Sequence, residues 1–458
     1  MTQYLNTDTI CAISTPQGTG GIAVVRVSGP EALPIVASRW NGADLTAMAS
    51  HTVHLGKITD TAGQILDEVV LTVFRAPHSF TGEDVLELSC HGSVWIQQQL
   101  VGTLIDAGCR LAMPGEFTRR AFANGRIDLS QAEAVADLIA SNSAASHRVA
   151  MNQMRGRFSS ELQHLRDRLL RFVSLIELEL DFSEEDVTFA DRGELTALAS
   201  EIQAVVSGLA QSFQAGNAIK NGVPVAIVGA TNAGKSSLLN ALLGDERALV
   251  SDIHGTTRDV IEDTITVQGI LFRFIDTAGI RQSADTIEQM GIERSYAKME
   301  QAQIVLWVVD NTAAADVSQH YATLIEPHCR GRQLIVVFNK ADVAVAPALS
   351  LPHGVRTISI SAHHESDVNR LRQLIVQVAA LPTVDDDAVI VTNARHYQAL
   401  VRAGQAIGRV LDGLRQGLSG DLLSQDIREC LHHLGTITGQ ITTDAILQSI
   451  FQNFCVGK

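Results

Sequence analysis

The spacing of apolar residues changes along the chain and separates regions of different secondary structure. Up to about residue 120, short strand-like apolar runs (22–27, 69–74 and 85–89) stand between glycine-containing turns and a few amphipathic helices, which predicts an α+β domain. From about residue 130 to residue 182, apolar side chains recur at steps of three and four, as on one face of a helix. We therefore expect an all-α region there, and we interpret the acidic stretch 177–194 as a solvated helix end and loop.

From residue 223 the pattern becomes that of buried strands alternating with helices, which predicts an α/β domain with a doubly wound parallel sheet. The strand-like runs are residues 223–228, 271–275, 304–309, 334–338 and 357–360. Pro382 and the acidic residues 385–387 indicate a linker, after which the helical pattern returns. A helical region interrupted by an α/β domain indicates an insertion. The predicted domains are 1–122, 123–217, 218–382 and 383–458, of which the second and fourth form one discontinuous helical domain.

The composition is that of a globular protein of several domains, with 458 residues, 46% of them apolar and 19% charged. The formal net charge of −15 disfavours unselective binding of nucleic acid through bulk charge. Residues 110–171 nevertheless hold ten arginines against six acidic residues. Contact with a nucleic acid should therefore be local, through this arginine-bearing part of the surface.

Neither export nor membrane insertion is expected. The first basic residue is Arg26, so the positively charged start of a signal peptide is missing. The longest apolar runs fall far short of the ~20 residues that span a bilayer. The six cysteines include no CxxC pair, which argues against a disulfide framework or a zinc cluster. We expect a cytoplasmic protein with reduced thiols.

Residues 229–236 carry a phosphate-binding motif. They read GATNAGKS, which fits GxxxxGK[ST], and they stand directly after a predicted strand and before a helical stretch. The glycines let backbone N–H groups close on phosphate oxygens at a helix N-terminus. Lys235 is expected to reach the β- and γ-phosphates and the Ser236 hydroxyl to ligate Mg²⁺.

Further motifs at strand ends predict that the bound nucleotide contains guanine. Asp276 opens a DTAG sequence that serves Mg²⁺ and the γ-phosphate, and Thr257 is placed to be a second Mg²⁺ ligand. Residues 339–342 read NKAD, in which Asp342 can accept paired hydrogen bonds from guanine, with Ser361 and the following alanine supporting the base. The set predicts a Ras-like GTPase domain.

One catalytic residue of Ras-like proteins has no counterpart here. Ile280 follows the DTAG motif where those proteins carry a glutamine that orients the attacking water. Glu288 is the best-placed acid in the following segment to take that role. The alternative for Glu288 is an acid on a helix surface, and the chemistry alone does not separate the two.

The motifs beyond the phosphate loop resemble those of one family. Residues 232–237 (NAGKSS), 255–259 (GTTRD) and 454–458 (FCVGK) carry the resemblance, together with 81–88 (TGEDVLEL) and 114–117 (PGEF) in the first domain. In these the chain resembles the TrmE–Era class of P-loop GTPases, and within it the MnmE, or TrmE, family of tRNA-modification GTPases. The resemblance covers essentially the whole chain.

For the GTPase domain, the resemblance implies pairing of two domains across their nucleotide faces when a potassium ion sits beside the phosphates. The implied K⁺ ligands are Asn232, Ser251, Ile253 and Thr256, and the Mg²⁺ ligands are Ser236 and Thr257. Catalysis is assigned to Glu288, Lys235 and Asp276. The implied GTP-binding residues are Asn232, Ala233, Gly234, Lys235, Ser236, Ser237, Ser251, Thr256, Thr257, Asp276, Thr277, Ala278, Gly279, Asn339, Lys340, Asp342, Ser361 and Ala362. The alternative for Asn232 is a residue that only stabilises the loop.

For the first domain, the resemblance implies dimerisation and binding of a 5-formyl-tetrahydrofolate as one-carbon donor. The matching positions are Arg26, Glu87, Arg126 and Lys458. A carboxylate suits the amino-pyrimidine face of a pterin and arginines suit glutamyl carboxylates, but each residue could instead belong to a structural ion pair. Cys455 is implied in tRNA modification, and its thiol either acts as a nucleophile or caps a helix.

The resemblance implies a homodimer that works in a heterotetramer with MnmG (GidA), a partner that carries FAD. Driven by GTP hydrolysis, the pair would add a carboxymethylaminomethyl-type group to C5 of the wobble uridine, U34, of certain tRNAs. Two other functions remain as alternatives. One is a GTPase switch in ribosome assembly, and the other is a folate-dependent one-carbon enzyme regulated by its GTPase domain.

Overall fold

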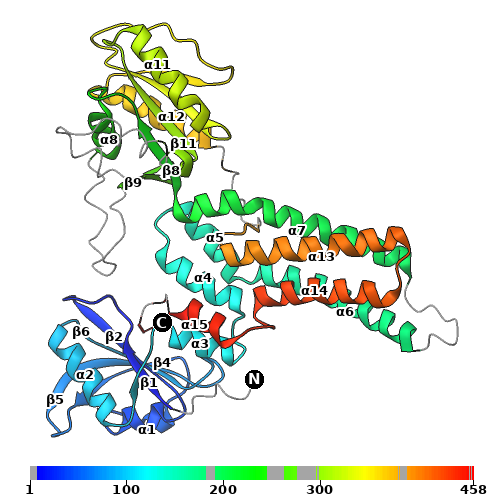
Figure 1. The fold of residues 1–458 in the computed structure, drawn as a ribbon. Helices are drawn as coiled ribbons and strands as arrows, with labels where there is room; N and C mark the ends of the chain where they lie inside the picture. The colour runs from blue at the N-terminus through cyan, green and yellow to red at the C-terminus, as the bar shows by residue number, and fades with distance from the viewer. Residues whose placement is uncertain are drawn as a thin grey trace. The chain divides into compact units, whose positions relative to one another are not determined.

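The computed structural model describes residues 8–181, 191–244, 263–275, 296, 299–379, 381, 389–452, 454, 456 and 457. The chain forms two compact units (Figure 1). Unit 1 comprises Met1–Ile139, Gln153–Gln203 and Arg402–Lys458, and unit 2 comprises Ala140–Asn152 and Ala204–Val401. The fold classes are those predicted, an α+β part, a helical part and an α/β part, whereas the domain boundaries given above stay predictions.

The N-terminal part of unit 1 is built on a seven-stranded sheet in the order β3-β4-β5-β6-β2-β1-β7. All neighbours are antiparallel except β1 and β7. Its elements are β1 (Ile10–Ile13), β2 (Ile22–Ser28), α1 (Ala32–Ala37), β3 (Trp40–Asn41), η1 (Leu45–Ala47), β4 (Thr52–Thr59), β5 (Ile65–Phe74), β6 (Val85–His91), α2 (Val94–Asp106) and β7 (Arg110–Leu111). Alternate strand residues such as Val25, Leu71 and Leu88 pack with Leu100 and Leu104 of α2 in one core.

The opposite face of this sheet is only partly covered. Helix α3 (Glu116–Ala123) lies over its β1 end, where the buried Phe117 packs on the side chains of β1. Towards β4 the same face carries Leu55 and Val70, which are opposite each other in the β4–β5 ladder and are 67% and 39% exposed. Arg26 and Glu87, likewise a directly opposed pair, lie on this face between the covered and the exposed parts.

The remaining elements of unit 1 are helical. Helix α6 (Arg157–Asp181) packs along α14 (Gly420–Thr438), and α15 (Asp444–Phe451) packs on α3. Phe451 and Phe454 form a cluster with Leu129 of α4 (Leu129–Ala140). The backbone of Gly115 has φ 66°, and an added Cβ there would lie 2.9 Å from Phe454, so this glycine makes room for the C-terminal segment.

The helical region predicted at 130–182 consists of three helices, α4, α5 (Ala144–Met154) and α6. The break between α5 and α6 lies at Gly156, whose φ of 78° is left-handed and ends the helix before it. Helices α7 (Arg192–Asn221) and α13 (Ala394–Gln416) each run from one unit into the other. In the described part of the chain, the structure contains no helix that is both long and apolar enough to cross a membrane.

Unit 2 is built on a six-stranded sheet in the order β13-β12-β11-β8-β10-β9. Its strands are β8 (Val223–Val228), β9 (Asp263–Val267), β10 (Ile270–Phe274), β11 (Ile304–Asp310), β12 (Gln333–Asn339) and β13 (Arg356–Ser359). Helices α8 (Lys235–Leu243) and α12 (Glu365–Ala379) share one core with the sheet, and α11 (Ala315–Ile325) shares the other, followed by η4 (Glu326–Cys329). The sheet therefore has helices on both faces, as a doubly wound fold requires.

The otherwise parallel sheet has one antiparallel edge strand. Strand β9 pairs antiparallel with β10, while the other neighbours are parallel. The two strands are joined at Gln268 and Gly269, whose φ values of 51° and 79° are those of a two-residue hairpin turn. Strand β9 was not predicted because its sequence, DTITV, contains only two apolar residues, Ile265 and Val267, and follows no clear turn signal.

Candidate functional site

The phosphate loop runs from the end of β8 to the first turn of α8. Gly229 and Gly234 have φ of 151° and 92°, conformations that side chains rarely adopt. A Cβ at Gly229 would lie 2.3 Å from the Val308 carbonyl oxygen, and one at Gly234 would lie 2.2 Å from Nδ2 of Asn339. Both glycines are therefore required by the path of the loop, and the loop delivers the N-terminus of α8 to the carboxyl edge of the sheet.

The lysine of the motif is held inside this loop. Nζ of Lys235 donates to the carbonyl oxygens of Gly229 (2.9 Å) and Ala230 (2.8 Å). Its ammonium thus lies where the loop amides and the helix N-terminus together favour an anion. Ser236 is half-buried in the same turn, whereas Asn232 is exposed on the loop with a φ of 63°.

Asn339 connects three loops at this edge of the sheet. Its Nδ2 donates to the carbonyl oxygen of Ala233 (2.9 Å), and its Oδ1 accepts from the backbone N–H of Ala362 (3.2 Å). The Ser361 N–H in turn donates to Asp367 (2.9 Å). The structure therefore brings together the phosphate loop, the NKAD motif and the Ser361–Ala362 pair, as the parallel strand order requires.

Lys340, which is predicted to recognise the base, contacts Asp310 at the end of β11. Lys340 has a φ of 61°, and its Nζ donates to Oδ2 of Asp310 at 2.6 Å. Oδ1 of Asp310 accepts from the N–H and the hydroxyl of Thr312 (2.8 and 2.6 Å). Burial alone would raise the pKa of Asp310, but the hydrogen bonds from Lys340 and Thr312 hold it below the usual value. Sequence reasoning missed Asp310, although an acid directly after a buried strand was a visible signal.

Asp342 itself is exposed to solvent. The Ser361 hydroxyl hydrogen-bonds to its carboxylate, which lowers the pKa of Asp342, so this residue remains an acceptor at neutral pH. An ionised carboxylate at this position is what recognition of the guanine N1–H and exocyclic amine requires.

The other predicted residues of the nucleotide site, and two of the C-terminal segment, lie outside the described residues. They are Ser251, Ile253, Thr256, Thr257, Asp276, Thr277, Ala278, Gly279, Glu288, Cys455 and Lys458.

In unit 1, Arg26 and Glu87 form an ion pair across strands β2 and β6. Both Nη2 and Nε of Arg26 approach Oε1 of Glu87, at 2.7 and 2.8 Å. The guanidinium carbon lies 5.7 Å from the centre of the Phe80 ring and 5.6 Å from that of Phe117, so aromatic rings hold it in place. The structural ion pair considered from the sequence is thus present, and Oε2 of Glu87 has no hydrogen-bond partner among the described residues.

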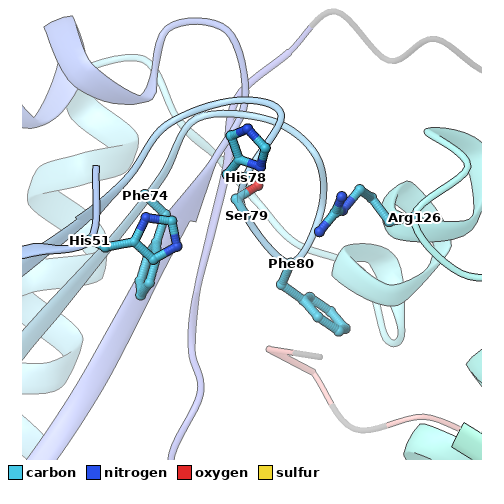
Figure 2. Close-up of a pocket in the computed structure, with 6 residues that line it drawn as sticks. All are labelled: His51, Phe74, His78, Ser79, Phe80 and Arg126. Atoms are coloured by element: carbon cyan, nitrogen blue, oxygen red, sulfur yellow. The ribbon is translucent and has the colours of Figure 1, made fainter. Parts of the chain in front are cut away.

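A cavity of about 440 Å³ adjoins this pair. It is lined by His51, Phe74, His78, Ser79, Phe80 and Arg126 (Figure 2). Phe80 belongs both to the cavity wall and to the rings around the Arg26 guanidinium. Phe80 therefore connects the Arg26–Glu87 pair to the cavity that Arg126 lines. The two histidines and the aromatic wall were not predicted from the sequence because they come from separate segments.

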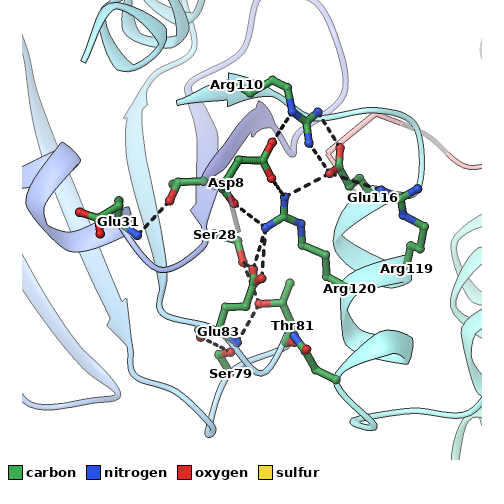
Figure 3. Close-up of polar contacts among 12 residues, drawn as sticks. Asp8, Ser28, Glu31, Ser79, Thr81, Glu83, Arg110, Glu116, Arg119 and Arg120 are labelled. Carbon is green, nitrogen blue, oxygen red and sulfur yellow. Dashed lines mark hydrogen bonds and ion pairs between the residues drawn. The ribbon is translucent and has the colours of Figure 1, made fainter. Parts of the chain in front are cut away.

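The same part of unit 1 contains a buried ionic cluster that the sequence did not predict (Figure 3). The fully buried Glu116 accepts hydrogen bonds from Arg110 (2.6 and 3.0 Å) and Arg120 (3.2 Å). Burial by itself would raise the pKa of Glu116, but the hydrogen bonds from Arg110 and the Met113 N–H and the nearby arginine charges lower it to about 2. Arg120 also contacts Glu83 (3.1 Å), so the cluster joins α3 to the loop that carries Phe80.

The sequence matches two protein-family descriptions. One, the GTP-binding protein TrmE N-terminus, matches residues 9–126, and the other, the MnmE helical domain, matches residues 129–455. A protein of Bacteroides thetaiotaomicron named tRNA modification GTPase MnmE is 56% identical over 467 residues, which cover 99% of this chain and 100% of the relative. Proteins of the same name from Bacteroides fragilis and Parabacteroides distasonis are 55% and 54% identical, over 99% and 98% of this chain and 100% of each relative. The chain therefore belongs to the MnmE family of tRNA modification GTPases.

Proposed function

We propose that the chain binds and hydrolyses GTP and that hydrolysis serves the modification of certain tRNAs. One observation carries the nucleotide part, namely that Asn339 joins the phosphate loop to the base-recognition loops by hydrogen bonds at 2.9 and 3.2 Å. The binding of a guanine base and the binding of phosphates thus involve one connected set of backbone groups. Lys235 and the N-terminus of α8 offset the negative charge of the phosphates.

We propose Mg²⁺ and K⁺ as the ions of this site. Ser236, in the first turn of α8, suits Mg²⁺ together with Thr257, and the exposed Asn232 suits K⁺ together with backbone oxygens at Ser251, Ile253 and Thr256. The left-handed backbone at Asn232 favours an asparagine, and its side chain has no partner in the described part of unit 2, which leaves its oxygen open to a cation. When bound, K⁺ supplies positive charge beside the transferring phosphoryl group.

We propose that the first domain binds a tetrahydrofolate and forms the homodimer. Oε2 of Glu87 is open to a hydrogen-bond donor such as the amino-pyrimidine face of a pterin, and Arg126 at the adjoining cavity suits a carboxylate. Lys458 is expected to contribute to the same site. The folate supplies the one-carbon unit. Exposed Leu55 and Val70 on the same face of the sheet are consistent with a covering partner subunit.

For the tRNA reaction we propose modification at C5 of the wobble uridine, U34, in a cytoplasmic heterotetramer with MnmG, which carries FAD. Cys455 is expected to act in this reaction and not in GTP hydrolysis. Nucleoside analysis of tRNA from cells lacking the gene, with wild type or Cys455→Ser restored, tests the assignment. An unchanged U34 in the deletion strain would remove it.

The hydrolytic part is tested with Glu288→Ala, which is expected to bind GTP and to lose turnover because the attacking water is no longer oriented. Glu300→Ala is the matched control, since Glu300 is an exposed acid of the same unit. Turnover is also expected to fall when Na⁺ replaces K⁺. Normal turnover in Glu288→Ala, or a rate indifferent to the cation, contradicts the corresponding assignment.

A further inference from the structure

We propose that the cavity beside Arg126 binds the γ-linked glutamyl tail of a folate, so that the chain prefers polyglutamylated over monoglutamyl folate. The inference rests on the proposed folate function and adds to it a second subsite, with His51 and His78 as tail-binding residues. A folate tail gains one carboxylate with every glutamyl unit, and recognition of the tail therefore requires several cationic or N–H-donating groups in one place.

The lining of the cavity has this composition. Arg126, His78 and His51 supply cationic or N–H-donating groups, Phe74 and Phe80 supply aromatic wall, and the described lining residues include no acid. Figure 2 shows the Arg126 guanidinium directed into the cavity from the side opposite His51 and Phe74. A volume of about 440 Å³ lies within the range of small-molecule sites.

The acids closest in sequence to the cavity, which are Glu83, Asp84 and Asp128, accept hydrogen bonds from residues outside its lining. Asp128 accepts from the Gln131 N–H at 2.9 Å. Glu83 accepts from Arg120 and from the Ser28 hydroxyl, and Asp84 accepts from the Ala76 N–H. The ion pair with Arg120 offsets the charge of Glu83, whereas the N–H partner of Asp84 is neutral and leaves its charge in place. Arg126 is the one described lining residue that carries a fixed charge, and its guanidinium attracts anions.

The cavity wall is held in a fixed arrangement. Asn124 donates to the Thr81 carbonyl oxygen at 2.7 Å, and the Arg126 N–H donates to Ala121 at 2.8 Å, so the end of α3 and the loop before β6 are tied together. The left-handed Gly82 lets the stem of Arg126 pass close, since a Cβ there would lie 3.1 Å from its Cγ. Arg126 thus reaches the cavity from a constrained position.

His51 stands in an unusual backbone conformation for a residue with a side chain, at φ 63°. Its N–H donates to Val73 (2.7 Å), its ring packs edge-on against Phe74 with centres 5.5 Å apart, and its Nδ1 lies 2.8 Å from the Ser50 hydroxyl. When that hydroxyl donates to Nδ1, Nε2 carries the proton and is a donor. Strained residues of this kind concentrate at ligand sites.

Continuity with the Arg26–Glu87 pair gives the direction of the ligand. Phe80 lies 5.7 Å from the Arg26 guanidinium and also lines the cavity. A folate whose pterin is recognised at Glu87 therefore has its other end beside Phe80, on the route to Arg126 and the histidines.

The test measures binding of 5-formyl-tetrahydrofolate monoglutamate and triglutamate to the full chain by titration calorimetry. The wild type is expected to bind the triglutamate between about 2- and 30-fold more tightly, since two exposed contacts to carboxylates contribute about 0.2–1 kcal/mol each. The variant His51→Asn/His78→Gln is expected to lose this preference and to keep its affinity for the monoglutamate. Asparagine is chosen at position 51 because it tolerates a left-handed backbone. His164→Gln, on the exposed face of α6, is the control and is expected to keep the preference.

The outcomes separate this inference from the function on which it rests. If the wild type binds both ligands equally, or if the preference survives in the double variant, the tail subsite is refuted while folate binding stands. If neither ligand binds the wild type, the proposed folate function fails and the subsite fails with it. Retained monoglutamate binding in the double variant shows that the first domain is folded.

Discussion

Asp310 is predicted to position Lys340 for guanine binding, although it belongs to none of the GTPase motifs. In the structure Lys340 is held by a 2.6 Å contact to Oδ2 of Asp310, while Thr312 holds the other carboxylate oxygen. In Asp310→Asn the Thr312 contacts can persist, but the new NH₂ group faces the ammonium of Lys340 and cannot accept from it. In this variant the Lys340 side chain is not held in place before the nucleotide binds, so nucleotide binding must order it.

The size of the effect follows from this ordering. Immobilising one long side chain at a binding site costs about 0.5–1.5 kcal/mol, and 1.4 kcal/mol is a factor of ten in affinity. Asp310→Asn should therefore weaken GTP and GDP binding by about 2- to 13-fold. Loss of the ion pair itself would add only slightly to this effect, because the Lys340 side chain is 35% exposed and its ammonium can bind water instead.

A double-mutant cycle on the dissociation constant of a fluorescent GDP analogue tests the mechanism. If Asp310 acts through Lys340, Asp310→Asn has no further effect in a Lys340→Ala background. Asp316→Asn, an exposed acid at the start of α11, is the control and should bind as the wild type does. Additive losses in the double variant would refute the reasoning, because they would mean that Asp310 contributes independently of Lys340.

Three further changes have expected outcomes. Gly234→Ala should abolish GTP binding, measured by equilibrium titration, because its Cβ would lie 2.2 Å from Nδ2 of Asn339 in a left-handed backbone. Glu116 has a pKa of about 2 in the folded chain and 4.5 in the unfolded chain, so its ionised form adds about 3 kcal/mol to the free energy of unfolding. This contribution is present above pH 4.5 and is lost as pH falls towards 2. Glu116→Gln should therefore lower the urea midpoint at pH 7 and make its decline below pH 4.5 shallower. Gly457→Ala should impair tRNA modification and spare GTP hydrolysis, because its Cβ would lie 2.2 Å from the Ile13 carbonyl oxygen and displace the segment that contains Cys455.

Each glycine change has a matched control. Gly208→Ala lies in α7, where an added Cβ meets nothing within 4 Å, and should leave GTP binding unchanged. Gly63→Ala is the control for Gly457→Ala. Gly63 has a left-handed backbone like that of Gly457, with φ 78° against 94°, but an added Cβ at Gly63 meets nothing within 4 Å. If Gly63→Ala reduced tRNA modification as much as Gly457→Ala, backbone strain and not the contact with Ile13 would be the cause. A decline in the urea midpoint of Glu116→Gln below pH 4.5 as steep as in the wild type would contradict the role given to that carboxylate.

The strands of unit 2 were predicted well because strands buried on both faces appear as unbroken apolar runs, such as β8 with Val225 and Ile227. The motifs between them then fell at the correct edge, since all parallel strands end on the same side. The turn at Gly156 was not predicted because the helical spacing of apolar residues continues on both sides of it. Such periodicity indicates which face of a helix is buried and does not show where the helix ends.

Sites assembled from distant segments were harder to predict. Asp8 pairs with Arg110 and Arg120 more than 100 positions away, and no local pattern marks such a partner. The cavity likewise joins His51 to Arg126, which periodicity cannot place together. Arg26 and Glu87 were found through the family resemblance, and the structure adds that they are directly opposed in one ladder.

The pairing of α6 with α14 has a consequence for how the chain is made. Roughly 240 residues separate the two helices, and synthesis at about 5–20 residues per second takes about 10 to 50 s to reach the second. During that time the leucine-bearing face of α6, including Leu162, Leu165 and Leu169, has no α14 to cover it. The nascent chain therefore exposes an apolar helix face while unit 2 is synthesised, and we expect chaperone binding or aggregation at α6 during that time.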